Sequence, residues 1–185
     1  MSYKLIILDR DGVINYDSDD YIKSIEEFKF IPKSIDAICK LSSLGYKVAI
    51  ATNQSGIFRQ YYTLSTLELM HKKLLTTVKS KGGNIDKILF CPHGPDENCQ
   101  CRKPKPGMLC QLIKHFKIKS EETIMVGDSV KDLQAAEKIG ITTVLVKTGK
   151  GLRSLESINK NPELLKNKFH IFNDLYHFTQ NIKTF

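Results

Sequence analysis

Short apolar runs alternate with helical patterns along the chain, and this alternation limits the folds that the chain can adopt. The apolar runs are rich in Ile, Val and Leu, and the segments between them carry apolar residues at helical spacing. We predict strands and helices at these positions: strands at 4–8, 47–51, 85–90, 123–126, 143–146 and 169–172, and helices at 34–44, 65–81, 107–116, 131–139 and near the C-terminus. Such alternation favours right-handed crossovers, so we expect one α/β domain over residues 1–185 with a doubly wound, mainly parallel sheet.

The helix expected at 65–81 has a signal at each end. Ser65 and Glu68 have the spacing of a capping box, and two glycines at 82–83 follow the last turn. His71 lies on the apolar face of this helix. We therefore expect His71 to be buried in the core rather than catalytic.

Polar clusters directly follow three of the predicted strands. Asp-Arg-Asp-Gly at 9–12 follows the first strand, Thr-Asn-Gln-Ser at 52–55 follows the second, and Gly-Asp-Ser at 127–129 follows the fourth. In open α/β sheets, ligands bind beyond the carboxyl ends of the strands. The three clusters are therefore expected to meet at one edge of the sheet.

The pair Asp9 and Asp11 suggests phosphoryl transfer assisted by a metal ion. A carboxylate that ends a buried strand is held rigidly and can be aimed at phosphorus, but an anionic phosphate ester repels it. A cation must screen that repulsion, and Mg²⁺ with oxygen ligands is the natural one, with Asp128 as a second carboxylate. Taken alone, each motif can also be an ordinary polar turn. We expect Asp132, one turn later, to cap a helix rather than to support the site.

Residues 91–101 carry four soft metal ligands within a short loop. Cys91, His93, Cys99 and Cys101 form a tetrahedral zinc set with no open position, which indicates a structural ion. The residues between them are mostly Gly, Pro, Asp and Asn, which cannot build a core. The alternative, buried thiols beside a surface histidine, leaves the loop without support. The odd number of cysteines and the lack of an export signal argue against a disulfide framework.

In this order the aspartate pair, Thr52, Lys103 and Asp128 resemble the four motifs of the haloacid dehalogenase superfamily of phosphohydrolases, over residues 4–150. The resemblance implies a phosphoric monoester hydrolase with a Rossmann-like fold. Asp9 would form an aspartyl-phosphate, and Asp11 would protonate the leaving group and then activate water.

The resemblance also implies the partners of these two aspartates. Thr52 and Lys103 would hold the charge of the transferring phosphoryl group, and Mg²⁺ would be bound by Asp9, Asp128 and the backbone carbonyl of Asp11. No insertion long enough for a large cap domain separates the motifs.

Two groups within the superfamily carry such a zinc loop, namely the heptose 1,7-bisphosphate phosphatases of nucleotide-heptose and lipopolysaccharide-core synthesis and the histidinol-phosphate phosphatases. Residues 101–108 (Cys-Arg-Lys-Pro-Lys-Pro-Gly-Met) and 51–57 (Ala-Thr-Asn-Gln-Ser-Gly-Ile) resemble the heptose group. This resemblance implies cleavage of the C7 phosphate, with histidinol phosphate as the alternative substrate. The residues expected to bind the substrate are Asp17, Asp20, Thr52, Asn53, Gln54, Ser55, Arg102 and Lys103.

The chain departs from the heptose group in three places. The zinc loop is short, and the stretch at 17–20 is more acidic than expected, so that it could also be an exposed acidic turn. Ser129 follows Asp128 where the group often carries lysine. This departure removes one phosphate contact and leaves more of the work to Arg102 and Lys103.

The net charge of +8 suits a small anionic substrate. The basic residues are spread along the chain without a dense run or interleaved aromatics, so a basic nucleic-acid-binding protein or a DNA 3′-phosphatase is the less favoured alternative. No apolar run approaches the roughly 20 residues of a membrane helix, and the N-terminus does not resemble a signal peptide. We expect a cytoplasmic monomer whose partner is a small phosphosugar.

Overall fold

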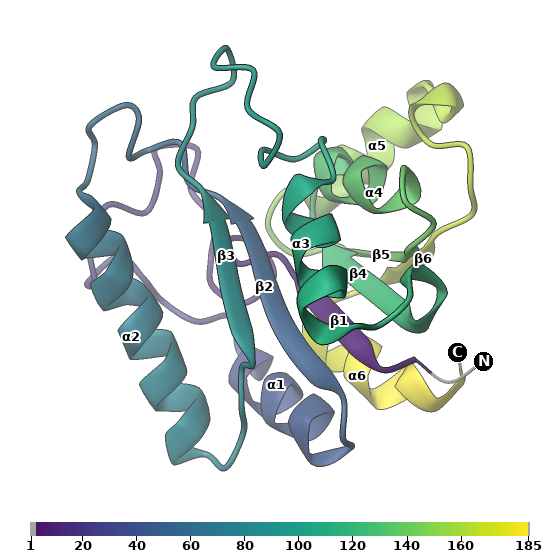
Figure 1. Cartoon of the computed structure of the whole chain (residues 1–185), viewed down its shortest axis with the longest axis horizontal. Helices are drawn as coiled ribbons and strands as arrows, with labels where there is room; N and C mark the ends of the chain where they lie inside the picture. Colours follow the sequence, from purple (N-terminus) through teal and green to yellow (C-terminus); the bar gives the residue numbers. More distant parts are fainter. Residues whose placement is uncertain (1–2, 185) are drawn as a thin grey trace.

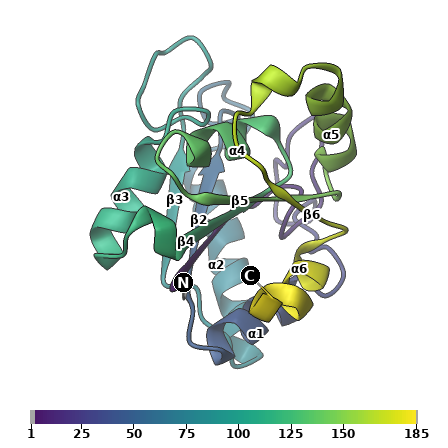
Figure 2. The same cartoon turned by 90° about the vertical axis from the view of Figure 1, so that its right-hand side faces the viewer.

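The computed structural model describes residues 3–184 as a six-stranded parallel sheet with helices on both faces (Figures 1 and 2). The strands lie in the order β3-β2-β1-β4-β5-β6, and every neighbouring pair is parallel. Their bounds are β1 Leu5–Leu8, β2 Lys47–Asn53, β3 Lys87–Cys91, β4 Thr123–Gly127, β5 Thr142–Val146 and β6 His170–Phe172. The α/β class and the doubly wound parallel sheet are confirmed.

Six α-helices cover the two faces of this sheet within the described residues. Helices α1, α2 and α6 pack on one face, and α3, α4 and α5 pack on the other (Figure 2). Their bounds are α1 Ser34–Ser43, α2 Leu64–Ser80, α3 Gly107–Phe116, α4 Val130–Glu137, α5 Gly151–Lys160 and α6 Leu175–Asn181. Short 3₁₀ turns lie at Ser120–Glu122, Pro162–Leu164 and Ile182–Thr184.

The central strand β1 shows why its sequence is continuously apolar. Ile6 and Leu8 belong to the core under α1, α2 and α6, whereas Leu5 and Ile7 belong to the core under α3 and α4. All four side chains are buried, so neither face of the strand tolerates a polar residue. This burial holds the end of β1, and therefore Asp9, in a rigid frame.

Three details differ from the sequence-based expectations. Helix α2 begins at Leu64, and its N-cap is Thr63, whose hydroxyl accepts a hydrogen bond from the Thr66 amide at 3.2 Å, so the capping box predicted at Ser65 is wrong. Helix α5 was not predicted. Cys110 is exposed, although its place in the helical pattern at 107–116 favours packing in the core.

The chain crosses the sheet from β1 outward to β3, returns to β4 on the other side of β1, and then runs outward to β6. The carboxyl ends of β1, β2 and β4 therefore meet at the switch point, where open α/β sheets bind ligands. No separate cap domain stands over this edge among residues 3–184. None of the described helices is long and apolar enough to cross a membrane.

Candidate active site

The three polar clusters line one cavity of about 500 Å³ at this edge of the sheet. The loops after β1, β2 and β4, the segment around Lys103 and the start of α5 all contribute to its wall. The lining includes these residues from the sequence-based set: Asp9, Asp11, Asp17, Thr52, Asn53, Gln54, Ser55, Arg102, Lys103 and Asp128. Asp20 is not part of this lining, whereas its neighbour Asp19 is.

Lys103 is the buried cation at the bottom of the cavity. Its ammonium lies 3.0 Å from Asp9 Oδ1 and 2.5 Å from Asp132 Oδ1, and it donates to the Ala51 carbonyl at 2.7 Å. Burial by itself lowers the pKa of Lys103, but the negative charges of Asp132 and Asp9 outweigh burial and hold this pKa above its ordinary value. Lys103 therefore stays charged and lies where a phosphoryl group bound to Asp9 would need compensation.

Asp9, Asp128 and Asp132 form an acidic cluster around that lysine. One carboxylate oxygen from each lies within 4.8 Å of the others. Burial and the charge of Asp132 raise the pKa of Asp9 to about 7, and burial with the charges of Asp9 and Asp132 raises the pKa of Asp128 well above its ordinary value. One ammonium does not balance three buried carboxylates, so the cluster fits a divalent cation with oxygen ligands.

Two of these carboxylates are better placed than the third to bind the cation. Asp132 already accepts from the amide of Ser129 at 3.0 Å and from its hydroxyl at 2.6 Å, and it pairs with Lys103. This contact caps α4, as expected, but Asp132 also holds Lys103, which the sequence did not reveal. Both oxygens of Asp132 are therefore engaged, whereas these contacts of Asp9 and Asp128 engage one oxygen each, Asp9 Oδ1 and Asp128 Oδ2, so their other oxygens fit Mg²⁺.

Asp11 is held in a network of donors. Arg10 donates to both of its oxygens, at 2.8 and 3.0 Å, Asn15 donates at 2.8 Å, and the Gln54 amide donates at 2.7 Å. Burial raises the pKa of Asp11, but the charge of Arg10 and the bond from Asn15 outweigh burial, so the net pKa is lowered. The carboxylate is therefore fixed in one orientation.

Gln54 links Asp11 to Thr52. The same amide nitrogen that donates to Asp11 also donates to Thr52 Oγ1 at 2.8 Å. Its carbonyl oxygen accepts from Tyr62 at 2.6 Å and from Arg10 at 3.1 Å. These internal bonds engage both ends of the buried amide, so Gln54 orients Asp11 and Thr52 while it also lines the cavity.

Arg10 is almost fully buried, which the sequence did not predict. Its guanidinium lies over the Phe28 ring, 5.2 Å from the centroid, and 3.3 Å from His71 Nε2. Burial and the charge of Arg10 lower the pKa of His71 to about 4. His71 is thus a neutral core residue, as expected from its place on α2.

Cys91, His93, Cys99 and Cys101 come together as a second metal cluster. The three sulfur atoms and His93 Nδ1 lie 3.2 to 3.6 Å apart in the contacts between them. A tetrahedral zinc ion with bonds of about 2.3 Å requires ligands about 3.7 Å apart. The cluster therefore fits a closed, structural zinc site.

The zinc loop is connected directly to the active site. Arg102 donates to the carbonyl of His93, a member of the metal cluster, at 3.1 Å. Asn53 and Lys103 exchange two hydrogen bonds, at 3.0 and 3.1 Å, which join the segment after the zinc loop to the end of β2. Asn53 thus has a structural partner in addition to its place in the cavity wall.

Two aspartates two residues apart, a buried lysine and further buried carboxylates meet at the ends of parallel strands, and this arrangement is that of a haloacid dehalogenase-type hydrolase. The HAD-hydrolase-like family model matches residues 100–176. A D-glycero-β-D-manno-heptose-1,7-bisphosphate 7-phosphatase from Pseudomonas putida is 60% identical over 153 residues, which cover 83% of this chain and 87% of the relative. The enzyme of this name from Neisseria meningitidis is 48% identical and covers 97% of this chain and 94% of its own length.

A solved structure agrees with these relatives. The crystal structure of a D,D-heptose 1,7-bisphosphate phosphatase from B. bronchiseptica, complexed with magnesium and phosphate, aligns with a TM-score of 0.92 at 39% identity, covering 98% of each chain. The chain belongs to the D-glycero-β-D-manno-heptose-1,7-bisphosphate 7-phosphatase family. Of the two groups with a zinc loop, the comparisons favour the heptose group.

Proposed function

We propose that this chain removes the C7 phosphate from D-glycero-D-manno-heptose 1,7-bisphosphate in nucleotide-heptose and lipopolysaccharide-core synthesis. The observation that supports this proposal best is Asp9, which ends a buried strand in a cavity 3.0 Å from a buried lysine, in a chain of this family. We propose further that residues 1–185 act as a single cytoplasmic domain and as a monomer, with a small phosphosugar as partner and neither nucleic acid nor a membrane.

In the first step, a carboxylate oxygen of Asp9 forms a bond to phosphorus while the bond from phosphorus to the sugar oxygen breaks. Asp11 gives a proton to the leaving oxygen, and Lys103 and Thr52 hold the charge of the transferring group. Arg10 and Asn15 keep the pKa of Asp11 low in the structure. The acid role therefore requires that the charge of the bound phosphate raise this pKa.

In the second step, Asp11 takes a proton from the water that attacks the aspartyl-phosphate, which releases phosphate and regenerates Asp9. Asp9, Asp128 and the backbone carbonyl of Asp11 would hold the cation. Mg²⁺ supplies charge screening between the nucleophile and the anionic ester when it is bound. Its removal should therefore abolish turnover.

Recognition of the remaining phosphate is assigned first to Arg102. Its guanidinium is a planar fork that suits two phosphate oxygens, and its contact with the His93 carbonyl fixes its position. Asp17 and Ser55 line the same cavity and are proposed to contact the sugar. Ser129 faces Asp132, so it does not replace the phosphate contact of the missing lysine.

The test is phosphate release from a panel of both heptose 1,7-bisphosphate anomers, histidinol phosphate and a DNA 3′-phosphate. We expect efficient, magnesium-dependent release from a heptose bisphosphate and little from the other two. In Asp9→Asn, turnover should be lost while the fold persists. Normal steady-state rates in that variant would refute the nucleophile, and a preference for histidinol phosphate would refute the substrate.

A further inference from the structure

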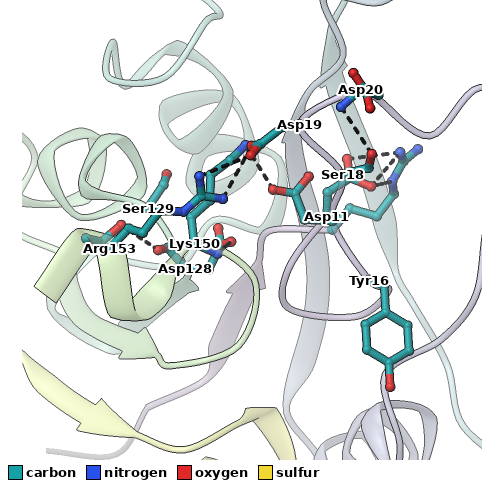
Figure 3. A network of polar contacts seen from close by, with 12 residues as sticks. Asp11, Tyr16, Ser18, Asp19, Asp20, Asp128, Ser129, Lys150 and Arg153 are labelled. Atoms are coloured by element: carbon teal, nitrogen blue, oxygen red, sulfur yellow. Dashed lines mark hydrogen bonds and ion pairs between the residues drawn. The ribbon is translucent and has the colours of Figure 1, made fainter.

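The cavity wall contains cations that the proposed chemistry does not use. Arg10 and Lys103 are buried and paired with the catalytic aspartates, and Arg102 donates to a zinc ligand. Two further cations, Lys150 and Arg153, line the cavity from the start of α5. They face the acidic stretch at 17–20, and Figure 3 shows Arg153 beside Asp19 and Lys150 beside Asp128.

Arg153 holds Asp19 in the geometry of a bound anion. Its Nη1 lies 3.1 Å from Asp19 Oδ2 and its Nη2 lies 3.3 Å from Asp19 Oδ1, so both arms of the fork meet one carboxylate. Two oxygens of a phosphate fit the same fork. The side chains of Arg153 and Asp19 are 64% and 69% exposed, and an ion pair this exposed is weak and easily exchanged.

Lys150 makes a similar pair next to it. Its ammonium lies 2.9 Å from Asp17 Oδ2. A phosphate dianion carries more charge than either carboxylate, so it can displace Asp17 and Asp19 from the two cations. In the absence of substrate, the carboxylates of Asp17 and Asp19 occupy the positions that we expect the phosphate oxygens to take.

The start of α5 is anchored to the catalytic centre, so its cations lie at a fixed reach from Asp9. The Lys150 amide donates to Asp128 Oδ2 at 2.7 Å, and the Ser154 hydroxyl donates to the Asp128 carbonyl at 2.8 Å. The Thr148 hydroxyl donates to the Gly12 carbonyl at 2.6 Å. Because of this rigid attachment, the site can select ligands whose two phosphates are separated by one particular distance.

We propose that Lys150 and Arg153 form a second anion site, which binds the phosphate that is not cleaved after that phosphate displaces Asp17 and Asp19. The inference rests on the proposed function, because only a bisphosphate brings a second dianion into the cavity. In this arrangement Arg102 contacts that phosphate from the zinc-loop side, and the α5 cations contact it from the other element. Asp17, displaced from Lys150, is then available for the contact with the sugar that is proposed above.

The competing explanation is that the ion pairs only tether the stretch at 17–20. The two explanations differ for Asp19→Asn. As an anion site, the freed Arg153 should bind the bisphosphate better, so KM should fall or stay constant. As a tether, Asp19→Asn and Arg153→Ala should damage the enzyme equally, and exchange of the two charges in Asp19→Arg/Arg153→Asp should restore it.

The experiment measures kcat and KM of these variants on the heptose 1,7-bisphosphate and on heptose 7-phosphate, which lacks the second phosphate. Arg153→Ala should raise KM for the bisphosphate about ten-fold, at the low end for a charge-assisted contact because the arginine is exposed. Its kcat and its KM for the monophosphate should change less than about two-fold. The charge exchange should keep the high KM. Lys160→Ala, which removes a cation at the far end of the same helix, is the matched control.

Each outcome separates this inference from the proposed function. A wild-type protein that does not release phosphate from the bisphosphate would refute the proposed function. A wild type that is active, with equal effects of Asp19→Asn and Arg153→Ala and rescue by the charge exchange, would refute the anion site alone. An equal rise of KM for both substrates in Arg153→Ala would refute it as well.

Discussion

The buried carboxylate at Asp9 makes a quantitative prediction about stability in the absence of magnesium. Its pKa is raised from 3.8 to about 7, by burial first and then by the charge of Asp132. The folded protein therefore holds a proton that the unfolded chain releases, so the free energy of unfolding falls as pH rises from about 4 to about 7 and then levels off. The loss of unfolding free energy is on the order of 4 kcal/mol at pH 8 and is clearly smaller at pH 5.

The variant Asp9→Asn removes this titration and also a charge that raises the pKa of Asp128, and both changes favour the variant at high pH. We expect thermal melts in chelator to show the variant more stable than wild type at pH 8, with a clearly smaller difference at pH 5. For a chain of this length, 4 kcal/mol corresponds to about 8–16 °C in Tm. Effects of the substitution that do not titrate appear at both pH values and cancel in this comparison.

Magnesium should oppose the loss of wild-type stability at high pH, because it binds the ionised carboxylates. The rise in Tm on adding Mg²⁺ should be clearly larger at pH 8 than at pH 5, and it should be small in Asp9→Asn. A wild-type Tm in chelator whose difference from Asp9→Asn does not change between pH 5 and pH 8 would refute the reasoning. So would an equal magnesium effect at both values.

Three further predictions concern the zinc loop, Arg102 and the Gln54 network. In Cys99→Ser/Cys101→Ser, metal analysis should find no zinc and activity should fall, because Arg102 is held by a carbonyl of the zinc loop; unchanged activity would show that the loop does not position the site. Arg102→Ala should lower kcat/KM for the bisphosphate roughly 10- to 150-fold, from about 1.5–3 kcal/mol for a charge-assisted contact, and should affect histidinol phosphate far less. In Tyr62→Phe, Gln54 loses a hydrogen-bond donor at 2.6 Å. Single-turnover assays should show that release of phosphate from Asp9 slows by about five-fold, while steady-state KM stays nearly constant. A change confined to KM would contradict the positioning role of Gln54.

The four inner strands of the sheet could be predicted from the sequence because they are almost entirely buried. A strand of this kind must be apolar at every position, as at Leu5–Leu8, so its boundaries are visible without any partner. Helix α5 could not be predicted in the same way. It begins with a glycine, and only three of its residues are apolar, of which Leu152 is exposed. Leu155 and Ile158, three apart, were the only signal of its buried face.

The site was harder to predict where it depends on contacts between distant residues. The sequence placed Lys103 in the site by its motif, but it gave no sign that Asp132 would meet that lysine in the fold. Gln54 was expected at the substrate, yet its amide is engaged by Tyr62 and Asp11. A single sequence shows which side chains carry chemistry, but not whether a neighbour has already taken their hydrogen-bonding groups.

The serine at position 129 shows how one departure from a family pattern is accommodated by the fold. A lysine there would add a cation beside Asp128, but it could not donate a hydroxyl proton to Asp132 as Ser129 does at 2.6 Å. That bond, together with the bond from the Ser129 amide, orients Asp132 toward Lys103. Serine at position 129 therefore helps to hold the buried Lys103, whereas lysine there would only add a positive charge. Lys150, whose amide binds Asp128, then brings a cation to the same side of the cavity from α5. In Ser129→Lys, Asp132 loses the serine hydroxyl, so we expect kcat for the bisphosphate to fall by a larger factor than KM improves. Steady-state kinetics on the bisphosphate measure both. A lower KM with an unchanged kcat would show that position 129 serves only to bind phosphate.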